Sequence, residues 1–543
     1  MTAQVRIATA SKDLFESLRL SLVRAGIGFE IEAQRLADGQ EVLEWLESGT
    51  RTLLVLDSLL PKVNGEGEYG TGYAAELLHE LRSRGIRTPV LVIMQGFDPD
   101  LERECNPDNL AIALPHEKLK HRARVVKPFM AMLMGRPDDG AEGSPAIPGT
   151  FRVIEVDFHH DRSVCSLGFD DKPDDLIEWR HTRSLHDIKT VAHVFSPMNA
   201  YDERGWIDKV RLGGEAVFGR HVMRAIGTGL FRHIEQAAGG LHRLSFRYGI
   251  SDPALYPAPF EGSLRGNDDG HDGLFVLLNA PVVRRLPRPQ VIRVSRHRTA
   301  RLPSRVRILF IRSQMSEHPE GRTEKDRLVV QDEGQNKTLL FPRLASIDVE
   351  LEHMTTLAAA VGRDRMELEP LNLSDFQTAE KGGALECIRS KLRNEKYDLV
   401  HYAGHAWSNG FSGRESNLLV LPGATLGQAV SLPIDELAEL AAKAEARFVY
   451  LSACRGTSTR SVQSFVAQGV PHALGFRCNV EDVRAAAFAR TFYTSLFGTN
   501  SSFCHSFREA CASARRDLVT DEESPIWVTP IMLAQSPDWA MRH

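Results

Sequence analysis

Residues 397–406 read YDLVHYAGHA, and residues 447–456 read RFVYLSACRG. Each stretch begins with a short apolar run and then breaks into small residues. Such runs are typical of buried strands in a parallel sheet. His405 follows the first run, and Cys454 follows the second. The pattern therefore predicts two parallel strands, each of which ends beside a reactive side chain.

The segment between these stretches favours placing the two strands side by side. Residues 433–444 carry apolar side chains at helical spacing, which predicts a crossover helix. A right-handed crossover brings both strand ends to the carboxyl edge of the sheet, where open α/β sheets bind their ligands. A thiol and an imidazole that meet at this edge can act as a nucleophile and its base.

The two stretches resemble the catalytic motifs of the CHAT peptidases, which belong to the caspase-like clan. The resemblance rests on Gly404-His405 and on the run from Leu451 to Gly456. Caspases carry an Ala-Cys-Arg-Gly core with the histidine about 50 residues upstream, as here. The resemblance to CHAT peptidases implies a caspase-like α/β sandwich and a cysteine endopeptidase that needs no cofactor. In this mechanism Cys454 attacks the scissile carbonyl and His405 transfers the proton.

The resemblance also assigns the group that binds the oxyanion. It implies that the backbone N–H groups of Ala406 and Cys454 supply the hydrogen bonds. The family usually has glycine at the position of Ala406, so this residue is a departure from the pattern. The departure keeps the N–H group but restricts the backbone.

Two residues near the motifs have more than one interpretation. Asp482 can select a basic residue before the cleaved bond, or it can cap a helix that starts at Val483. His401 lies inside the first strand and is expected to pack rather than to catalyse. A single cysteine or histidine beside a strand is usually a core residue. The alternative to the peptidase is therefore a catalytically dead CHAT scaffold.

The N-terminal residues 1–138 show alternating strand and helix patterns, which predict a doubly wound, flavodoxin-like domain. This pattern resembles the receiver domains of two-component signalling. Asp57 stands at the position of the family's phosphorylated aspartate, and Lys127 begins a Lys-Pro-Phe run that resembles the end of the fifth strand. In receivers this lysine contacts the phosphoryl group.

The receiver pattern lacks two features that phosphorylation requires. Residues 9–11 contain no acid where receivers hold Mg²⁺, and Met94 replaces the usual serine or threonine. These departures favour a pseudo-receiver that docks a regulatory protein. The alternative is a two-component output protein that is phosphorylated at Asp57.

Composition changes divide the rest of the chain. Residues 139–150 and the Arg/Pro-rich residues 285–303 are predicted linkers. Residues about 313–338 are charged and contain scattered glycines, which predicts a mobile insert. The resulting domains are a receiver-like domain at 1–138, a pseudo-caspase half at 151–284 that resembles CHAT proteins only loosely, and a catalytic half at 304–543.

Bulk properties narrow the functional classes. The 543 residues carry a net charge of −5 and have a pI near 6.5, which disfavours a general nucleic-acid-binding surface. The sequence shows neither a membrane-spanning apolar run nor a signal peptide. Seven scattered cysteines without a Cys-x-x-Cys pair favour reduced thiols and no metal site. These properties favour a cytoplasmic protein. The resemblance to CHAT peptidases implies a bacterial-type protease that cleaves a specific partner protein in antiviral defence or programmed cell death.

Overall fold

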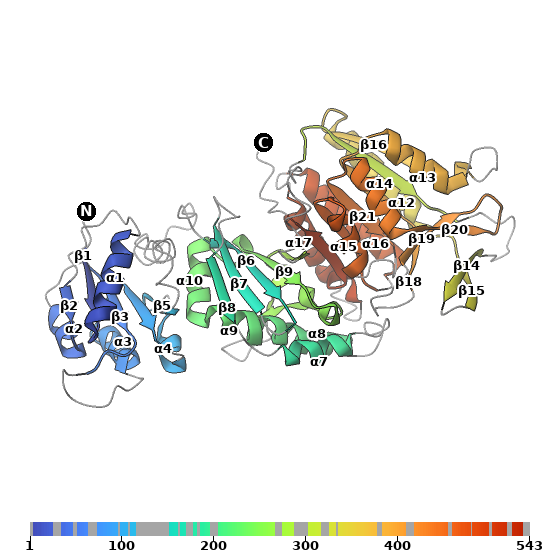
Figure 1. Ribbon diagram of the computed structural model, residues 1–543. Coiled ribbons are helices and arrows are strands. Elements are labelled where there is room, and N and C mark those ends of the chain that lie inside the picture. Colours follow the sequence, from blue (N-terminus) through green and yellow to red (C-terminus); the bar gives the residue numbers. More distant parts are fainter. Residues whose placement is uncertain are drawn as a thin grey trace. The chain divides into compact units, whose positions relative to one another are not determined.

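The computed structural model of the protein describes residues 4–24, 34–46, 52–62, 73–95, 98–106, 109–115, 151–160, 163–169, 177–181, 185–195, 205–265, 274–286, 302–315, 325–332, 335–376, 383–408, 417–453, 459–478, 480–498, 502–517 and 524–535. The chain divides into two compact units, both shown in Figure 1. One unit comprises Met1–Ile154, Cys165–Trp179 and Val222–Leu244, and the other comprises Glu155–Val164, Arg180–His221 and Ser245–His543. Residues 139–150 and most of 285–303, the predicted linkers, lie outside the described residues. The predicted domain limits remain a prediction.

The first unit contains a five-stranded parallel sheet with the strand order β2-β1-β3-β4-β5. This order is that of the flavodoxin-like doubly wound fold. Strands β1, β3, β4 and β5 are mostly apolar and buried, as expected of a parallel sheet covered by helices. The elements are β1 (Gln4–Ala8), α1 (Lys12–Arg24), β2 (Gln34–Leu36), α2 (Gly39–Leu46), β3 (Thr52–Asp57), α3 (Tyr73–Ser83), β4 (Val90–Met94), α4 (Pro99–Glu104) and β5 (Ala111–Pro115).

The sheet confirms the doubly wound prediction but corrects one of its details. The fifth strand ends at Pro115, so the expectation that Lys127 closes this strand is wrong. Lys127 itself lies outside the described residues. The sequence from residue 105 to 124 is too irregular to reveal β5, because the strand is only five residues long.

A second, 11-stranded sheet carries the two stretches that opened the sequence analysis. Its strand order is β16-β13-β17-β21-β22-β23-β12-β9-β6-β7-β8. The α/β fold class is therefore confirmed for this part as well. The strands are β16 (Met366–Asn372), β13 (Val306–Arg312), β17 (Leu399–Ala403), β21 (Phe448–Ser452), β22 (His472–Phe476), β23 (Pro530–Ala534), β12 (Val282–Arg285), β9 (Ser245–Ile250), β6 (Phe151–Phe158), β7 (Ser163–Phe169) and β8 (Ile177–His181).

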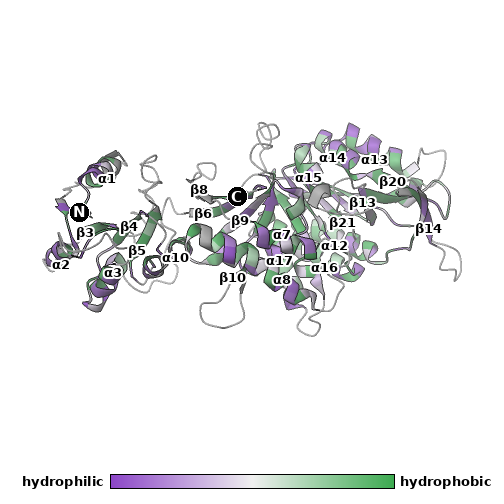
Figure 2. Cartoon of the chain, turned by 60° about the horizontal axis from the view of Figure 1, so that its bottom comes forward, coloured by the Kyte–Doolittle hydropathy of each residue, from purple (hydrophilic) through white to green (hydrophobic). Residues whose placement is uncertain are grey.

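Helices cover both faces of the part of this sheet that runs from β16 to β23 (Figure 1). Figure 2 shows the hydrophobic strands lying between helices whose outer sides are hydrophilic. One layer contains α12 (Ser346–Val361), α16 (Asp482–Phe497) and α17 (Phe503–Arg516), and the other contains α13 (Gly383–Asn394), α14 (Ile434–Lys443) and α15 (Thr459–Ala467). The predicted crossover helix is α14, and that prediction is confirmed.

Side chains of β21 alternate between these two helical layers, as strand geometry requires. Val449 and Leu451 belong to the apolar core that also contains residues of α13, α14 and α15. Phe448 stacks on Phe492 of α16, with ring centroids 5.2 Å apart, and Tyr450 lies 6.0 Å from the ring of Tyr493. Ser452 shares the parity of Tyr450, so it faces the layer of α12 and α16.

A seam joins the early and late parts of the second unit. Strand β12 lies between β9 and β23 and is parallel to both, although residues 286–529 separate β12 from β23 in the sequence. Arg284 of β12 bonds to both carboxylate oxygens of Glu261, at 2.6 and 2.7 Å, and Arg477 reaches the same carboxylate at 3.0 Å. All three side chains are buried. A fully desolvated ion cluster therefore fixes this junction.

Two segments around the crossover add small sheets. The stretch between β17 and α14 forms β18 (His405–Ser408), β19 (Asn417–Pro422) and β20 (Ala429–Pro433). The predicted mobile insert contains a hairpin of β14 (Asp326–Asp332) and β15 (Gln335–Phe341), so that expectation is wrong for these residues. Leu328 and Val330 of the hairpin pack on Val420 of β19.

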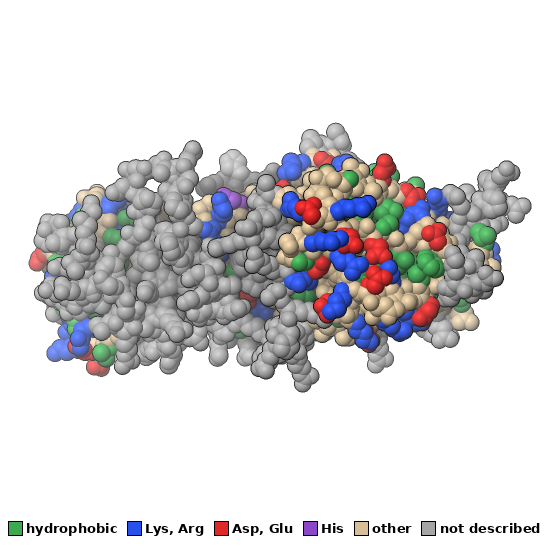
Figure 3. Space-filling model, turned by 90° about the horizontal axis from the view of Figure 1, so that it is seen from above, with side chains coloured by type: hydrophobic (Ala, Val, Ile, Leu, Met, Phe, Trp, Pro, Cys, Tyr) green, Lys and Arg blue, Asp and Glu red, His purple; other side chains and the backbone are tan. Residues whose placement is uncertain are grey.

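Charged side chains of both signs lie next to each other on the surface of the second unit seen in Figure 3. Arg307 contacts Glu367, Glu369 and Glu395, and Arg389 pairs with Glu436 at 2.6 Å. Partly exposed pairs of this kind contribute little to stability individually. This face therefore presents no large field of a single sign.

Candidate active site

The ends of β17 and β21 lie next to each other at one edge of the sheet. The two strands are parallel, and Ala403 is the register partner of Ser452. The amide of Gly404 donates to the carbonyl of Ser452 at 3.1 Å. A Cβ at Gly404 would come within 2.7 Å of both Ser313 and the Tyr402 hydroxyl, so only glycine fits this turn.

His405 begins β18 immediately after this turn. It pairs with Val420 of β19, and its ring lies 5.1 Å from that of Phe341. Its Nε2 lies 2.6 Å from the backbone carbonyl oxygen of Pro342. Because a carbonyl only accepts hydrogen bonds, this contact assigns the proton to Nε2 and leaves Nδ1 as the proton acceptor of the neutral ring.

The electrostatic surroundings of His405 favour its neutral form. Burial lowers the pKa of His405 below its ordinary value of 6.5, although the Pro342 carbonyl and the carboxylates of Asp482 and Asp326 act in the opposite direction. A lowered histidine pKa means that the uncharged imidazole persists to a more acidic pH than in a free peptide. Near neutral pH the ring can therefore accept a proton.

A buried tyrosine fixes the backbone around His405. The hydroxyl of Tyr402 lies 2.8 Å from the carbonyl oxygens of both His405 and Val420. Ser313 donates to the same Val420 carbonyl at 2.7 Å. These bonds connect the histidine turn to β19 and to the end of β13.

Of the other residues in the two predicted motifs, the structure describes Ala406 and Ala453 but not Cys454. Ala406 is buried opposite Leu419 in the ladder between β18 and β19. Ala453, which follows Ser452, is also buried. Cys454 comes next in the sequence and lies outside the described residues. Its catalytic and oxyanion roles are taken up as proposals below.

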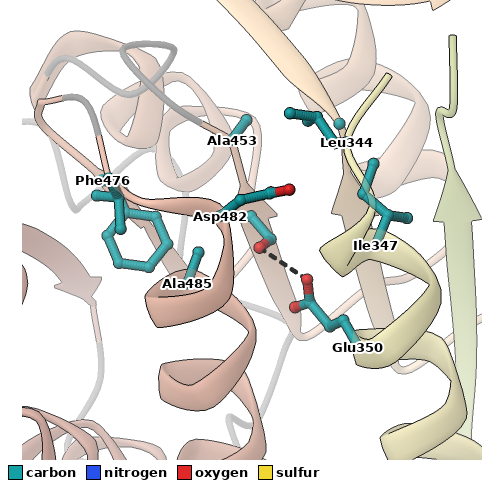
Figure 4. A pocket seen from close by; sticks show the side chains of 10 residues that line it. Leu344, Ile347, Glu350, Ala453, Phe476, Asp482 and Ala485 are labelled. Carbon is teal, nitrogen blue, oxygen red and sulfur yellow. Dashed lines mark hydrogen bonds between the residues drawn. The ribbon is translucent and has the colours of Figure 1, made fainter. Parts of the chain in front are cut away.

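Asp482 lies beside these strand ends but does not cap its own helix. Helix α16 begins at Asp482 itself, and Glu481 at the N-cap position makes no side-chain bond there. The carboxylate instead accepts from the amide of Ser346, the first residue of α12, at 3.3 Å. Figure 4 shows the side chain reaching from the start of α16 toward α12. The capping interpretation is therefore wrong.

A small pocket opens between the starts of α12 and α16. The strand ends contribute Gly404, Ser452 and Ala453, and the helices contribute Glu350 and Asp482 (Figure 4). Two carboxylates thus line a pocket that adjoins the turn of His405 and the residue before Cys454.

Two contributors to this site were not predicted from the sequence. Pro342 acts through its backbone carbonyl, for which no sequence signal exists. Glu350 lies on the buried stripe of α12 between Ile347 and Met354. An acid in an apolar stripe is a signal that could have identified it. His401 packs in the core as expected, and its buried ring contacts Glu350 and Tyr493 as well as apolar neighbours.

In the N-terminal unit, Asp57 is buried at the end of β3. Thr9 donates to one carboxylate oxygen at 2.7 Å, and the amide of Leu59 donates to the other at 3.1 Å. Thr9 stands where a receiver carries a metal-binding acid. Among the described residues, no group of three or more histidine, cysteine or acidic side chains is arranged to hold a metal ion.

Incubation with acetyl phosphate and Mg²⁺ should leave the intact mass of the protein unchanged. Both oxygens of Asp57 already accept bonds, and residues 9–11 offer no acid for the Mg²⁺ that phosphoryl transfer needs. Intact mass spectrometry checks this result, with Asp57→Asn as the control. A phosphoryl adduct that forms on the wild type and disappears in Asp57→Asn would restore the two-component alternative.

Comparison with known proteins identifies the family. The family model of the CHAT domain matches residues 222–541, which is more than half of the chain. The chain therefore belongs to the CHAT domain family. No curated protein matches the chain. In the described part of the chain, no helix is both long and apolar enough to cross a bilayer.

Solved receiver domains are similar to the N-terminal region. The receiver domain of the Francisella response regulator 1452 is 19% identical, with a TM-score of 0.18, and the match covers 23% of this chain and 96% of that one. For the receiver of the putative response regulator NarL from Mycobacterium tuberculosis, the values are 20% identity, a TM-score of 0.19, and coverage of 25% and 98%. The isolated receiver domain of RcsB from Salmonella enterica serovar Typhimurium is 15% identical, with a TM-score of 0.20, and the match covers 25% of this chain and 95% of that one. The receiver-like description rests on the strand order, and these matches add no argument to it.

Proposed function

We propose that the chain is a caspase-like cysteine endopeptidase in which Cys454 is the nucleophile and His405 is the base. The observation that carries this proposal is the geometry of His405 at the shared edge of β17 and β21. The bond to the Pro342 carbonyl orients the ring and sets its tautomer, which is what a base needs from a third group. Cys454 comes two residues after Ser452, the last residue of the neighbouring strand.

The proposed reaction follows from these two groups. Nδ1 of His405 takes the thiol proton, and the Cys454 sulfur attacks the carbonyl carbon of the scissile peptide. The carbonyl oxygen becomes an oxyanion, for which the N–H groups of Ala406 and Cys454 are the proposed donors. His405 then gives its proton to the leaving amine as the C–N bond breaks. Water hydrolyses the resulting thioester and regenerates the thiol.

An electrophilic peptide probe, such as an acyloxymethyl ketone that ends in arginine, should label Cys454 selectively. The described cysteines are poor competitors, because five of them are buried and burial raises the pKa of the half-buried Cys387. Peptide mass mapping locates the label. Cys387→Ala should label like the wild type, and Cys454→Ala should not label. Equal labelling of Cys454→Ala would contradict the proposed nucleophile.

We propose further that Asp482 favours a basic residue before the cleaved bond. Its carboxylate lines the pocket beside the strand ends. Asp482→Asn keeps an oxygen for the Ser346 amide but removes the charge. We expect this variant to lose roughly 10- to 100-fold of its preference for arginine over a neutral residue, equivalent to losing one charge-assisted hydrogen bond of about 1.5–3 kcal/mol.

Profiling with a library of fluorogenic peptides measures this preference. Glu481→Gln is the matched control, because Glu481 is the adjacent acid and is exposed, where it pairs with Arg484 at 2.7 Å. The control should keep the wild-type profile. An unchanged profile in Asp482→Asn would remove Asp482 from the specificity site while leaving the proposed nucleophile intact.

The biological role is also a proposal. We propose that the receiver-like domain docks a regulatory protein, and that the peptidase cleaves one specific partner in bacterial antiviral defence or programmed cell death. Support comes from the fusion of a receiver-like fold, whose Asp57 is engaged by Thr9, to a CHAT domain. The products of neighbouring genes are the first substrates to test. Cleavage of such a product by the wild type, and not by Cys454→Ala, would identify the partner.

A further inference from the structure

A carboxylate is buried beneath the two strand ends that carry the candidate dyad. Glu350 of α12 is 4% exposed, and His401 of β17 is fully buried. Glu350 Oε1 lies 3.0 Å from His401 Nε2. Its other oxygen accepts a hydrogen bond from Ser452 Oγ at 3.0 Å, which is the bond drawn in Figure 4. One side chain on a helix therefore touches both β17 and β21.

The two contacts of Glu350 differ in kind. The bond from Ser452 has normal hydrogen-bond geometry. Glu350 Oε1 and His401 Nε2 lie 3.0 Å apart, but within the described residues these two atoms make no hydrogen bond. The other nitrogen of His401 bonds to the Tyr493 hydroxyl at 2.9 Å, and the ring stacks on Phe310 at 4.6 Å. His401 is thus held firmly in the core while Glu350 connects it to Ser452.

Burying a carboxylate at this place is costly. An apolar side chain on the stripe of α12 would avoid the desolvation penalty of the carboxylate and is often neutral or stabilising at such sites. Burial, together with the charge of Glu350, raises the pKa of the neighbouring Tyr450 and Tyr493 hydroxyls, which therefore stay neutral. Stability alone does not account for an acid here.

The positions of the two contacts suggest what the acid does. Ser452 is the register partner of Ala403 and comes two residues before Cys454, and its carbonyl also receives the amide of Gly404, which precedes His405. A displacement of Ser452 would therefore move the end of β21, which Cys454 follows in the sequence, and the Gly404 amide that precedes His405. The contact to His401 holds Glu350 against β17, the strand that ends just before His405.

We propose that Glu350 is a positioning residue, which clamps Ser452 against β17 and thereby fixes the two strand ends that His405 and Cys454 follow in the sequence. The consequence for catalysis rests on the proposed peptidase function, whereas the clamp itself is a property of the fold. A displacement of about 1 Å at reacting groups can lower a rate by on the order of 10²-fold, so a lost clamp should act on kcat rather than on substrate binding.

The test compares Glu350→Gln, Glu350→Ala, Ser452→Ala and the double Glu350→Ala/Ser452→Ala in the full chain. Glutamine keeps an oxygen for the Ser452 hydroxyl, so it should retain most of the activity. Glu350→Ala and Ser452→Ala should each lower kcat on the order of 10²-fold with KM little changed. The loss in kcat of the double variant should be no greater than that of the more impaired single variant, because both substitutions remove the same clamp. Glu352→Ala is the control, since Glu352 is an exposed acid on the same helix.

Hydrogen exchange supplies a readout that does not need activity. Glu350→Ala and Ser452→Ala should raise exchange in peptides covering 399–408 and 448–453, while β9 stays protected. If the wild type cleaves nothing, the peptidase proposal falls, and exchange alone decides whether the clamp exists. Unchanged exchange at both strand ends would overturn the clamp in either case. A loss that Glu350→Gln shares, and that shows as a raised KM for substrates with a basic residue, would overturn positioning and make Glu350 a substrate contact.

Discussion

Replacing His405 with alanine should lower kcat for any peptide substrate on the order of 10⁴-fold or more. In nucleophile–base pairs, losing the base removes both activation of the thiol and protonation of the leaving amine, and such losses reach about 10⁶-fold in the best-measured triads. The expectation is specific to His405, because its ring is the one that Pro342 orients beside the two strand ends.

Turnover of a fluorogenic peptide, selected by library profiling of the wild type, measures this effect. His79→Ala is the matched control, since His79 is an exposed histidine on α3, in the other compact unit. Far-UV circular dichroism shows whether each variant is folded. A folded His405→Ala protein that cleaves the peptide at a rate close to that of the wild type would contradict the proposed base.

Replacing Glu261 with alanine should destabilise the second unit by about 3–5 kcal/mol. The change leaves the guanidinium groups of Arg284 and Arg477 buried without the carboxylate that both contact. Urea unfolding followed by circular dichroism measures the loss as a lower midpoint of the transition of this unit. Glu439→Ala, which removes an exposed partner of Lys443, should leave the midpoint unchanged.

The contribution of the same cluster to folding stability depends on pH. Burial alone would raise the pKa of Glu261, but Arg284 and Arg477 outweigh it and hold the pKa below its ordinary value of 4.5. A carboxylate with a lowered folded-state pKa contributes stability above that ordinary value, and the contribution is lost as the pH falls through the folded-state pKa. Glu261→Ala should therefore approach the wild type in stability only below pH 4.5. A variant as stable as the wild type at pH 7 would contradict the role given to the cluster.

The sequence predicted the parts of the fold that depend on local patterns. The buried runs of β17 and β21 and the apolar periodicity of α14 are visible within a few residues. The residues that follow these strands could therefore be identified, and His405 does stand next to the end of β17.

The missed parts depend on contacts between distant segments. One side of the hairpin of β14 and β15 is exposed, including Val329 and Leu340, and its other side is covered by Val420, about 90 residues later in the chain. Nothing local distinguishes such a segment from a mobile insert, although it delivers the Pro342 carbonyl to His405. Asp482 shows the same limit, since its position at the start of a helix indicated a cap, whereas its bond goes to the amide of another helix.

The place of β12 in the second sheet limits how this protein can be cut into working pieces. A fragment that begins at residue 304 would contain both His405 and Cys454 but would lack β12 and Glu261. Strand β23 would then expose an unpaired edge, and Arg477 would lose its carboxylate. Open edges of this kind recruit strands from other molecules, so the fragment would associate or precipitate. Residues 304–543 are therefore not an independent module, and any shorter folded version would have to keep the strand that precedes them in the chain.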